Sequence, residues 1–189
     1  MKNFKLSALA IIALFAISSC SKKDDPAPVN EEEVITTVVT TLSNLSGNVV
    51  LTSKDADGDG PAAAILSQTG NIVAGRVYTG SATFLNELKN PASDITPEIL
   101  TEGVDHQLFF QANTTVGIFA YDDLDANGKP IGLKFKFIAA AAANAQQQNL
   151  TVTLRHLPNK SGSGVSAGNI ANAAGATDAE VMFKVVINP

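Results

Sequence analysis

The stretch Leu-Lys-Phe-Lys-Phe at residues 133–137 sets the fold class of this chain. Its apolar and charged side chains alternate with a period of two, so an extended strand here has one apolar and one charged face. Residues 150–155, Leu-Thr-Val-Thr-Leu-Arg, repeat the pattern, and alternate positions of residues 181–187 are apolar. This pattern predicts strands that cover a core with one face and meet water with the other.

Shorter segments of β-type composition extend the pattern on both sides. They are rich in Val, Ile, Thr and aromatic residues, and turn-forming residues such as Gly80 separate them. Between them we find no helix long enough for parallel crossovers. The chain is therefore predicted to be all-β, a single antiparallel immunoglobulin-like β-sandwich of about 8–9 strands over residues 34–189. The shorter segments are residues 34–42, 48–52, 72–78, 81–88, 107–111 and 115–121.

Three other segments are predicted to be helix or loop. One short helix is expected at residues 97–101, because Thr96 is a good N-cap and Pro97 suits the first helical position. Residues 139–148 have a helix-forming composition but lie between two strands, which leaves a helix and a loop with one helical turn as alternatives. Residues 159–176 are rich in Gly, Ser, Ala and Asn, which predicts a long mobile loop.

The N-terminus has the pattern of a bacterial lipoprotein signal. Two lysines in residues 1–5 precede an apolar run at residues 6–17, and two serines then precede Cys20. The run is shorter than the about 20 residues that span a bilayer. We predict a signal peptide over residues 1–19, then lipidated Cys20 and a flexible tether over residues 20–33. An ordinary secretion signal is the alternative.

The charge of the chain excludes one class of partner. The formal net charge is −5, and removal of the signal with Lys2 and Lys5 leaves 18 acidic residues against 11 basic ones. Binding to nucleic acid needs clustered Lys and Arg to neutralise phosphates, so no nucleic-acid partner is expected. The membrane contact is expected to run through the lipid on Cys20. Once this only cysteine is acylated, no thiol remains for disulfides or metal ligation.

Two acidic loops share the pattern D-x-D-x-[DN]-G, which opens many calcium-binding loops. Alternating carboxylates can surround Ca²⁺, which takes 6–8 oxygen ligands. The bidentate Glu of an EF-hand is missing, because Leu66 and Lys134 stand at the twelfth positions. A calcium site in a β-loop and plain turn formation both remain open. The candidate ligands are Asp55, Asp57 and Asp59 in one loop, and Asp122, Asp123, Asp125 and Asn127 in the other.

No catalytic set emerges from the sequence. The serines lack a nucleophile-elbow context, and two histidines far apart in the chain do not build a zinc site. By alternation, His156 lies on the face of Val152 and Leu154, where it ends a core strand. Trp is absent, which weakens a sugar-binding interpretation. The chain is therefore predicted not to be an enzyme, and no catalytic residue is assigned.

Six segments of the chain carry a family resemblance: residues 20–25, 84–91, 94–99, 105–110, 123–133 and 150–160. Together they resemble a group of uncharacterised outer-membrane lipoproteins of Bacteroidota-type bacteria. Similar sequences sometimes carry a type 1 periplasmic-binding label, but that fold is a two-lobed α/β protein, and this chain is too short and too β-rich for it.

The resemblance implies a location. In these bacteria, Lys23, Asp24 and Asp25 just after Cys20 look like a signal for export to the cell surface, with the periplasmic leaflet as the alternative. From the sequence as a whole we predict a palmitate-anchored, non-enzymatic binding or structural module with an unidentified protein or small-molecule partner. The alternative is a lipoprotein that captures a small molecule or glycan in a pocket of the sandwich or its loops.

Overall fold

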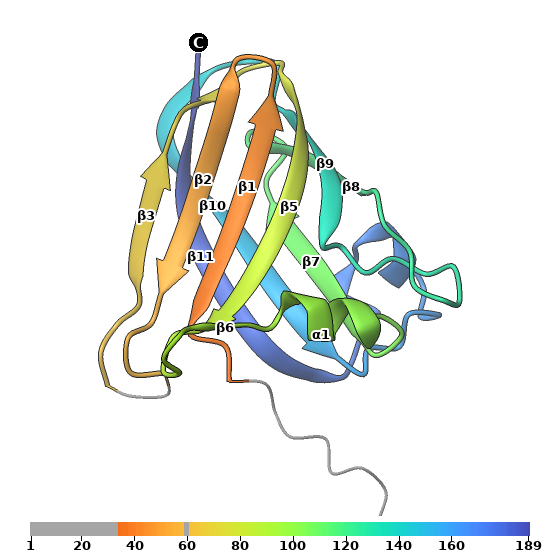
Figure 1. The fold of residues 1–189 in the computed structure, drawn as a ribbon. Helices are drawn as coiled ribbons and strands as arrows, with labels where there is room; N and C mark the ends of the chain where they lie inside the picture. Colours follow the sequence, from red (N-terminus) through yellow and green to blue (C-terminus); the bar gives the residue numbers. More distant parts are fainter. Residues whose placement is uncertain (1–33, 59–60) are drawn as a thin grey trace, which may run out of the picture. The chain divides into compact units, whose positions relative to one another are not determined.

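The computed structural model describes residues 34–58 and 61–189, and its strands form two sheets (Figure 1). Neighbouring strands pair antiparallel, except that β4 and β11 pair parallel. The first sheet has the order β3 (Ile65–Thr69), β2 (Gly47–Lys54), β1 (Thr37–Asn44), β5 (Val77–Asn86), β9 (Lys134–Ala139) and β8 (Gly117–Tyr121), and β6 (Ser93–Asp94) pairs with β5. The second has the order β4 (Ile72–Val73), β11 (Ala176–Asn188), β10 (Asn144–His156) and β7 (His106–Ala112).

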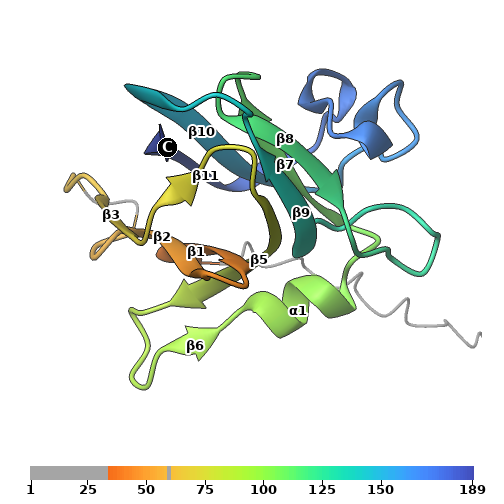
Figure 2. The ribbon, with the colours of Figure 1, turned by 90° about the horizontal axis from the view of Figure 1, so that it is seen from above.

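The two sheets pack face to face as a sandwich (Figures 1 and 2). In β9 every second side chain is buried, as the alternation predicts, and the same holds in β5. Phe135 and Phe137 of the first sheet share one core with Leu150 and Phe183 of the second. The prediction of an all-β antiparallel sandwich is confirmed.

The strand order does not confirm the immunoglobulin-like label. Strands β1, β2 and β3 form a meander of consecutive neighbours at one side of the first sheet. In an immunoglobulin domain the third strand lies in the opposite sheet. The structure also has two strands that the sequence does not predict, because β3 is exposed on both faces and β6 has only two residues. The predicted strand at residues 72–78 is divided between β4 and the start of β5.

Gly80 does not separate two strands, so that prediction is wrong. Strand β5 runs through it, and Gly80 pairs with Phe135 of β9. A Cβ atom at Gly80 would lie 2.1 Å from Cε2 of the Phe135 ring. The glycine therefore makes room for a core aromatic side chain and does not mark a turn.

The two alternatives for residues 139–148 are both wrong from Asn144 onward. Strand β10 begins there, and Asn144 pairs with Ile187 of β11. Pairing with the long β11 strand overrides the helical propensity of this segment. The predicted short helix is confirmed as α1 (Thr96–Thr101), although Ile95 and not Thr96 stands at its N-cap.

The segment 159–176 is a loop as far as Gly175, as predicted, and it is folded around its own small core. It contains two 3₁₀ helices, η1 (Val165–Ala167) and η2 (Ile170–Asn172). Val165 and Ala173 are buried against Phe109 of β7. The Gln107 side chain fixes the loop further, because its Nε2 donates to the Val165 carbonyl at 2.9 Å.

The predictions for the N-terminus lie outside the described residues. These are the signal peptide at residues 1–19, lipidated Cys20, and the tether with Lys23, Asp24 and Asp25. They stay predictions, as do the limits of the domain. In residues 34–58 and 61–189, no helix is long and apolar enough to cross a membrane.

Candidate functional site

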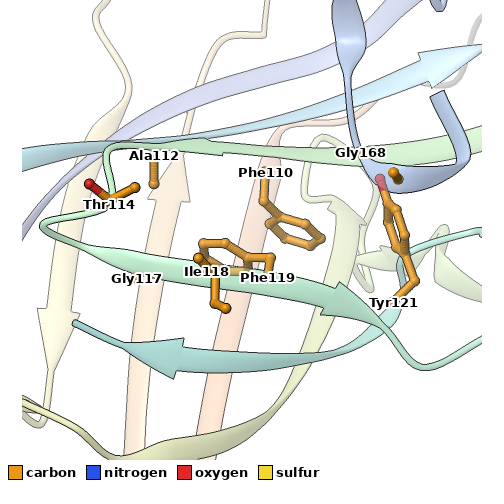
Figure 3. A pocket seen from close by; sticks show the side chains of 9 residues that line it. Phe110, Ala112, Thr114, Gly117, Ile118, Phe119, Tyr121 and Gly168 are labelled. Atoms are coloured by element: carbon orange, nitrogen blue, oxygen red, sulfur yellow. The ribbon is translucent and has the colours of Figure 1, made fainter. Parts of the chain in front are cut away.

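A cleft of about 220 Å³ lies between β7 and β8, the strands at the ends of the two sheets (Figure 3). A tight turn joins these strands, closed by a hydrogen bond from the Val116 N–H to the Asn113 carbonyl. The chain thus passes from one sheet to the other at one end of the cleft. The lining residues are Phe110, Ala112, Thr114, Gly117, Ile118, Phe119, Tyr121, Ala167 and Gly168.

The alternation of the two strands explains this lining. Phe110 and Ala112 are two residues apart on β7, and Phe119 and Tyr121 are two apart on β8, so each pair lies on one face of its strand. At Gly117, φ is 149°, and a Cβ atom there would lie 2.3 Å from the Ile138 carbonyl oxygen. Glycine is therefore needed where β8 begins beside β9.

Aromatic rings form the floor of the cleft. The Phe110 and Phe119 rings are stacked, with centroids 4.7 Å apart and planes inclined by 5°. Phe110 also packs on the core ring of Phe135 at 4.3 Å. Aromatic pairs of this kind contribute about 0.5–1.5 kcal/mol beyond their buried area. The floor is therefore a continuation of the core that reaches the open side of the sandwich.

The Tyr121 hydroxyl is already engaged at the cleft wall. It donates to the Leu108 carbonyl at 2.6 Å and accepts from Gln107 Nε2 at 3.1 Å. Burial raises the pKa of Tyr121 to about 12; the hydrogen bond from Gln107 opposes this rise and the charge of Asp123 adds to it. The hydroxyl is therefore neutral at ordinary pH and is committed to protein partners.

The carboxylates of the second acidic loop form turns. Asp123 Oδ1 and Oδ2 accept from the N–H groups of Gly132 at 2.7 Å and Lys134 at 2.9 Å. Asp125 Oδ1 accepts from the N–H groups of Asn127 and Lys129. Asp122 lies 3.3 Å from Lys136 Nζ in an exposed ion pair. In the described residues these carboxylates do not form a group of metal-ligand spacing.

The first acidic loop shows the same turn chemistry where it is described. Asp55 Oδ1 accepts from the Asp57 N–H, and Asp57 Oδ2 accepts from the Ala62 N–H, both at 3.2 Å. Asp59 lies outside the described residues. Calcium binding at the two loops stays a prediction, tested by comparing melting curves in calcium and in a chelator.

His106 and His156 lie side by side in the fold, so the expectation that these two histidines are too far apart to act together is wrong. His106 begins β7, His156 ends β10, and the two are direct partners in the β10–β7 register. His156 is buried on the face of Leu154, as the alternation predicts. Sequence patterns could not reveal this pairing, because register depends on which strands become neighbours.

A pocket in the sandwich or its loops was one alternative from the sequence, but the residues that line the cleft were not predicted. Phe110, Phe119 and Tyr121 occupy alternating positions of two predicted strands, which is a signal for an apolar face, but their meeting depends on the strand order. Comparisons of this chain with protein-family models, with curated proteins and with solved structures find no match.

Proposed function

We propose that this protein is a lipid-anchored protein of the outer membrane, exposed at the cell surface, whose sandwich is a non-enzymatic binding module. The signal-like sequence of residues 1–25 supports the anchor. The aromatic cleft between β7 and β8 carries the binding role, because it is concave and has apolar side chains at its floor. The cleft favours a role in the capture of a small ligand over a purely structural role, because a purely structural module would have a filled interior at this edge.

The ligand that fits the cleft best is a small molecule with one aromatic ring. An engineered apolar cavity of about 150 Å³ holds benzene, so a cleft of about 220 Å³ accommodates one ring with small substituents. A guest ring can extend the cluster of Phe110 and Phe119 by offset or edge-to-face packing.

A sugar ring fits the same space but not the same chemistry. Sugar recognition needs polar groups that converge on the hydroxyls, and the Tyr121 hydroxyl is already bonded to Leu108 and Gln107. Thr114 is the one other lining residue with a hydroxyl. The cleft therefore suits an aromatic ring better than a sugar.

The test uses two tryptophan variants of the full-length protein. Ala167 lines the cleft and is exposed, so Ala167→Trp should fill the cleft without disturbing the core; Ala171→Trp, at an exposed position of the same loop, is the matched control. Because the chain has no other tryptophan, fluorescence reports the position of each new side chain directly.

Ligand-observed NMR with phenol and with methyl glucoside should detect phenol binding to the wild type and to Ala171→Trp, and none to Ala167→Trp. Binding of methyl glucoside but not of phenol would show that the cleft binds a sugar and not an aromatic ring. Equal binding, or no binding, of both probes in all three proteins would leave the structural module as the remaining class.

A further inference from the structure

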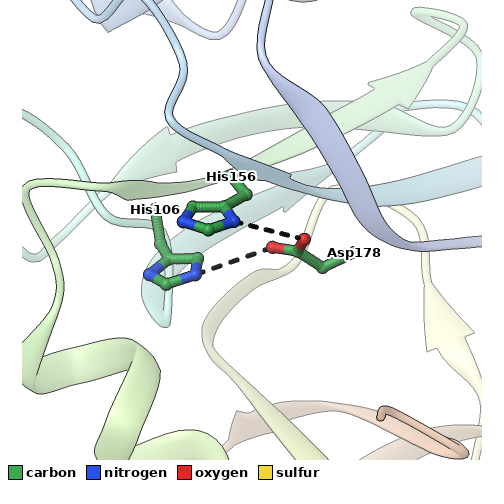
Figure 4. A group of neighbouring side chains, drawn as sticks. All are labelled: His106, His156 and Asp178. Atoms are coloured by element: carbon green, nitrogen blue, oxygen red, sulfur yellow. Dashed lines mark ion pairs between the residues drawn. The ribbon is translucent and has the colours of Figure 1, made fainter. Parts of the chain in front are cut away.

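Three polar side chains from three strands meet near one end of the second sheet (Figure 4). His106 at the start of β7 and His156 at the end of β10 are register partners. Their rings are stacked, with centroids 4.8 Å apart and planes inclined by 13°. Both rings turn a nitrogen toward Asp178 of β11. The cluster shares no residue with the aromatic cleft.

A β-bulge supplies the carboxylate. Leu154 pairs with Ala179, and the next residue of β10, Arg155, pairs with Thr177, so Asp178 is the extra residue of β11. Bulges of this kind redirect a side chain and are enriched beside functional sites. Here Asp178 Oδ2 lies 3.6 Å from His106 Nε2, and Oδ1 lies 3.8 Å from His156 Nδ1.

We propose that His106, His156 and Asp178 bind a divalent transition-metal ion, with Zn²⁺ as the best match. Two imidazole nitrogens and one carboxylate oxygen are a common donor set for zinc, with a further position left for water. The three ligand atoms all lie within 4.8 Å of one another. Two ligands on one zinc ion can be at most about 4.2 Å apart, twice the Zn–N bond, and the distances from His106 Nε2 and His156 Nδ1 to the Asp178 carboxylate already lie within this limit.

The hydrogen bonding of His106 is the second observation that points to a metal. Its Nδ1 lies 3.1 Å from the carbonyl oxygen of Glu102, the C-cap residue of α1. A carbonyl can only accept, so Nδ1 carries the hydrogen, and Nε2 is the ring nitrogen on the side of Asp178. A histidine that binds a metal through one ring nitrogen usually donates the hydrogen of the other nitrogen to a carbonyl or carboxylate, which fixes the orientation of the ring.

The cluster is largely buried, and the backbone around it has an unusual conformation. The side chains of His106 and Asp178 are 0% and 3% exposed. Leu157, directly after His156, has φ of 50°, which is unusual for a non-glycine residue and is found at functional sites. At Gly175 a Cβ atom would lie 2.2 Å from the His156 carbonyl oxygen, so only glycine lets β11 approach there.

An open pocket offers a route for the ion. A pocket of about 350 Å³ lies beside β11, and Asp178 is part of its lining together with Thr177 and Val38. Binding should draw the two imidazole rings together and tilt them out of their parallel arrangement, because the in-plane lone pairs of both rings must then converge on one ion.

The experiment measures zinc binding by the full-length chain in detergent, with Cys20→Ser in every sample so that no thiol competes. After dialysis against Zn²⁺ we expect one zinc ion per chain. Asp178→Asn and His156→Gln keep the side-chain volume approximately and should weaken zinc binding at least about tenfold. Asp122→Asn, in an exposed acidic loop, is the matched control and should bind zinc as the parent chain does.

Two further measurements keep the result interpretable if a variant is poorly folded. Zinc should raise the melting temperature of the parent chain and leave that of Asp178→Asn unchanged. In the parent chain, ¹⁵N NMR of the imidazoles should show a zinc-induced shift at His106 Nε2. Absence of zinc retention, retention unchanged in both cluster variants, or imidazole signals that do not respond to zinc would each overturn the proposal.

Discussion

Lys160 Nζ lies 2.8 Å from Asp125 Oδ2 in a buried ion pair that joins two loops 35 residues apart in the sequence. The two side chains are 6% and 1% exposed. The ammonium group also donates to the carbonyls of Pro130, at 2.9 Å, and Gly103, so each of its three hydrogens has an acceptor. One side chain thus connects the end of α1, the second acidic loop and the segment after β10.

The pair changes the ionisation of both groups. Burial alone would raise the pKa of Asp125, but the hydrogen bonds from Lys160 and from the Lys129 and Asn127 N–H groups together outweigh it and lower this pKa. Burial lowers the pKa of Lys160, and the contact with Asp125 offsets this only in part. Asp125, a candidate calcium ligand from the sequence, therefore already has a cation as its partner.

Loss of one member of the pair should be strongly destabilising. Lys160→Met leaves the Asp125 carboxylate buried without its cation, and breaking a buried ion pair in this way costs about 3–5 kcal/mol. Lys136→Met is the control, because Lys136 and Asp122 form an exposed pair, worth about 0–1 kcal/mol. Urea unfolding measures both variants. Equal loss of unfolding free energy in the two would show that the buried pair has no special role.

A methyl group at Gly80 should conflict with the Phe135 ring. The added Cβ would lie 2.1 Å from that ring, so Gly80→Ala should lower the free energy of unfolding by about 1–3 kcal/mol, as for other overpacked cores. In a Phe135→Leu background the same substitution should cost much less. Ser81→Ala, at the next and exposed position of β5, should be close to neutral. A cost that is the same in both backgrounds would contradict the steric explanation.

The sequence predicts the fold class because the core-forming strands bury one face each. β9 shows this alternation in its burial as in its sequence. β10 shows it from Leu150 to His156 except at Thr153, which is buried as well. β3 has no such signal, because all five of its side chains are exposed. The sequence around Gly80 suggests a turn, because the contact that requires glycine there is made by the Phe135 ring on another strand.

The sites depend on information that local patterns do not contain. His106 and His156 meet only because β7 and β10 are neighbours in one register, and Asp178 joins them only through a bulge. The cleft exists because β7 and β8 stand at the ends of two different sheets. Strand order and register are properties of the whole sandwich, so neither site follows from spacing along the chain.

Tyr121 should remain protonated far into the alkaline range. Its folded pKa of about 12 lies above the ordinary value of 10.0, so its contribution to stability is complete below pH 10 and is lost as the pH rises toward 12. Tyr121→Phe should lack this loss. It should also cost about 1–2 kcal/mol at neutral pH, because the Leu108 carbonyl and the Gln107 amide lose a partner.

Absorbance of tyrosinate measures the ionisation of Tyr121. Since the chain has two tyrosines, the difference between wild type and Tyr121→Phe isolates this one side chain. A midpoint of the difference signal near pH 10 would contradict the burial and hydrogen bonding assigned to the hydroxyl.

Lipid attachment at Cys20 should anchor the protein. Cys20→Ala should remove the acylation site, so the protein should leave the membrane fraction and take up no labelled fatty acid. Ser21→Ala, the neighbouring position, should behave as the wild type. The readouts are cell fractionation and acyl labelling. Retention of the Cys20→Ala variant in the membrane, together with an unlabelled wild type, would contradict the proposed anchor.

Export to the cell surface should depend on Lys23, Asp24 and Asp25. These charged residues lie within five positions of Cys20, the proposed acylation site, where a transport machinery can recognise them. Protease added to intact cells should remove the wild-type domain. The variant with all three residues changed to Ala should stay in the membrane fraction but resist the protease, because it remains on the inner side. A soluble periplasmic protein in the same cells serves as the control for an intact outer membrane. If the protease removes both forms equally, or spares both, these three residues do not direct export, whereas the anchor at Cys20 is unaffected by that result.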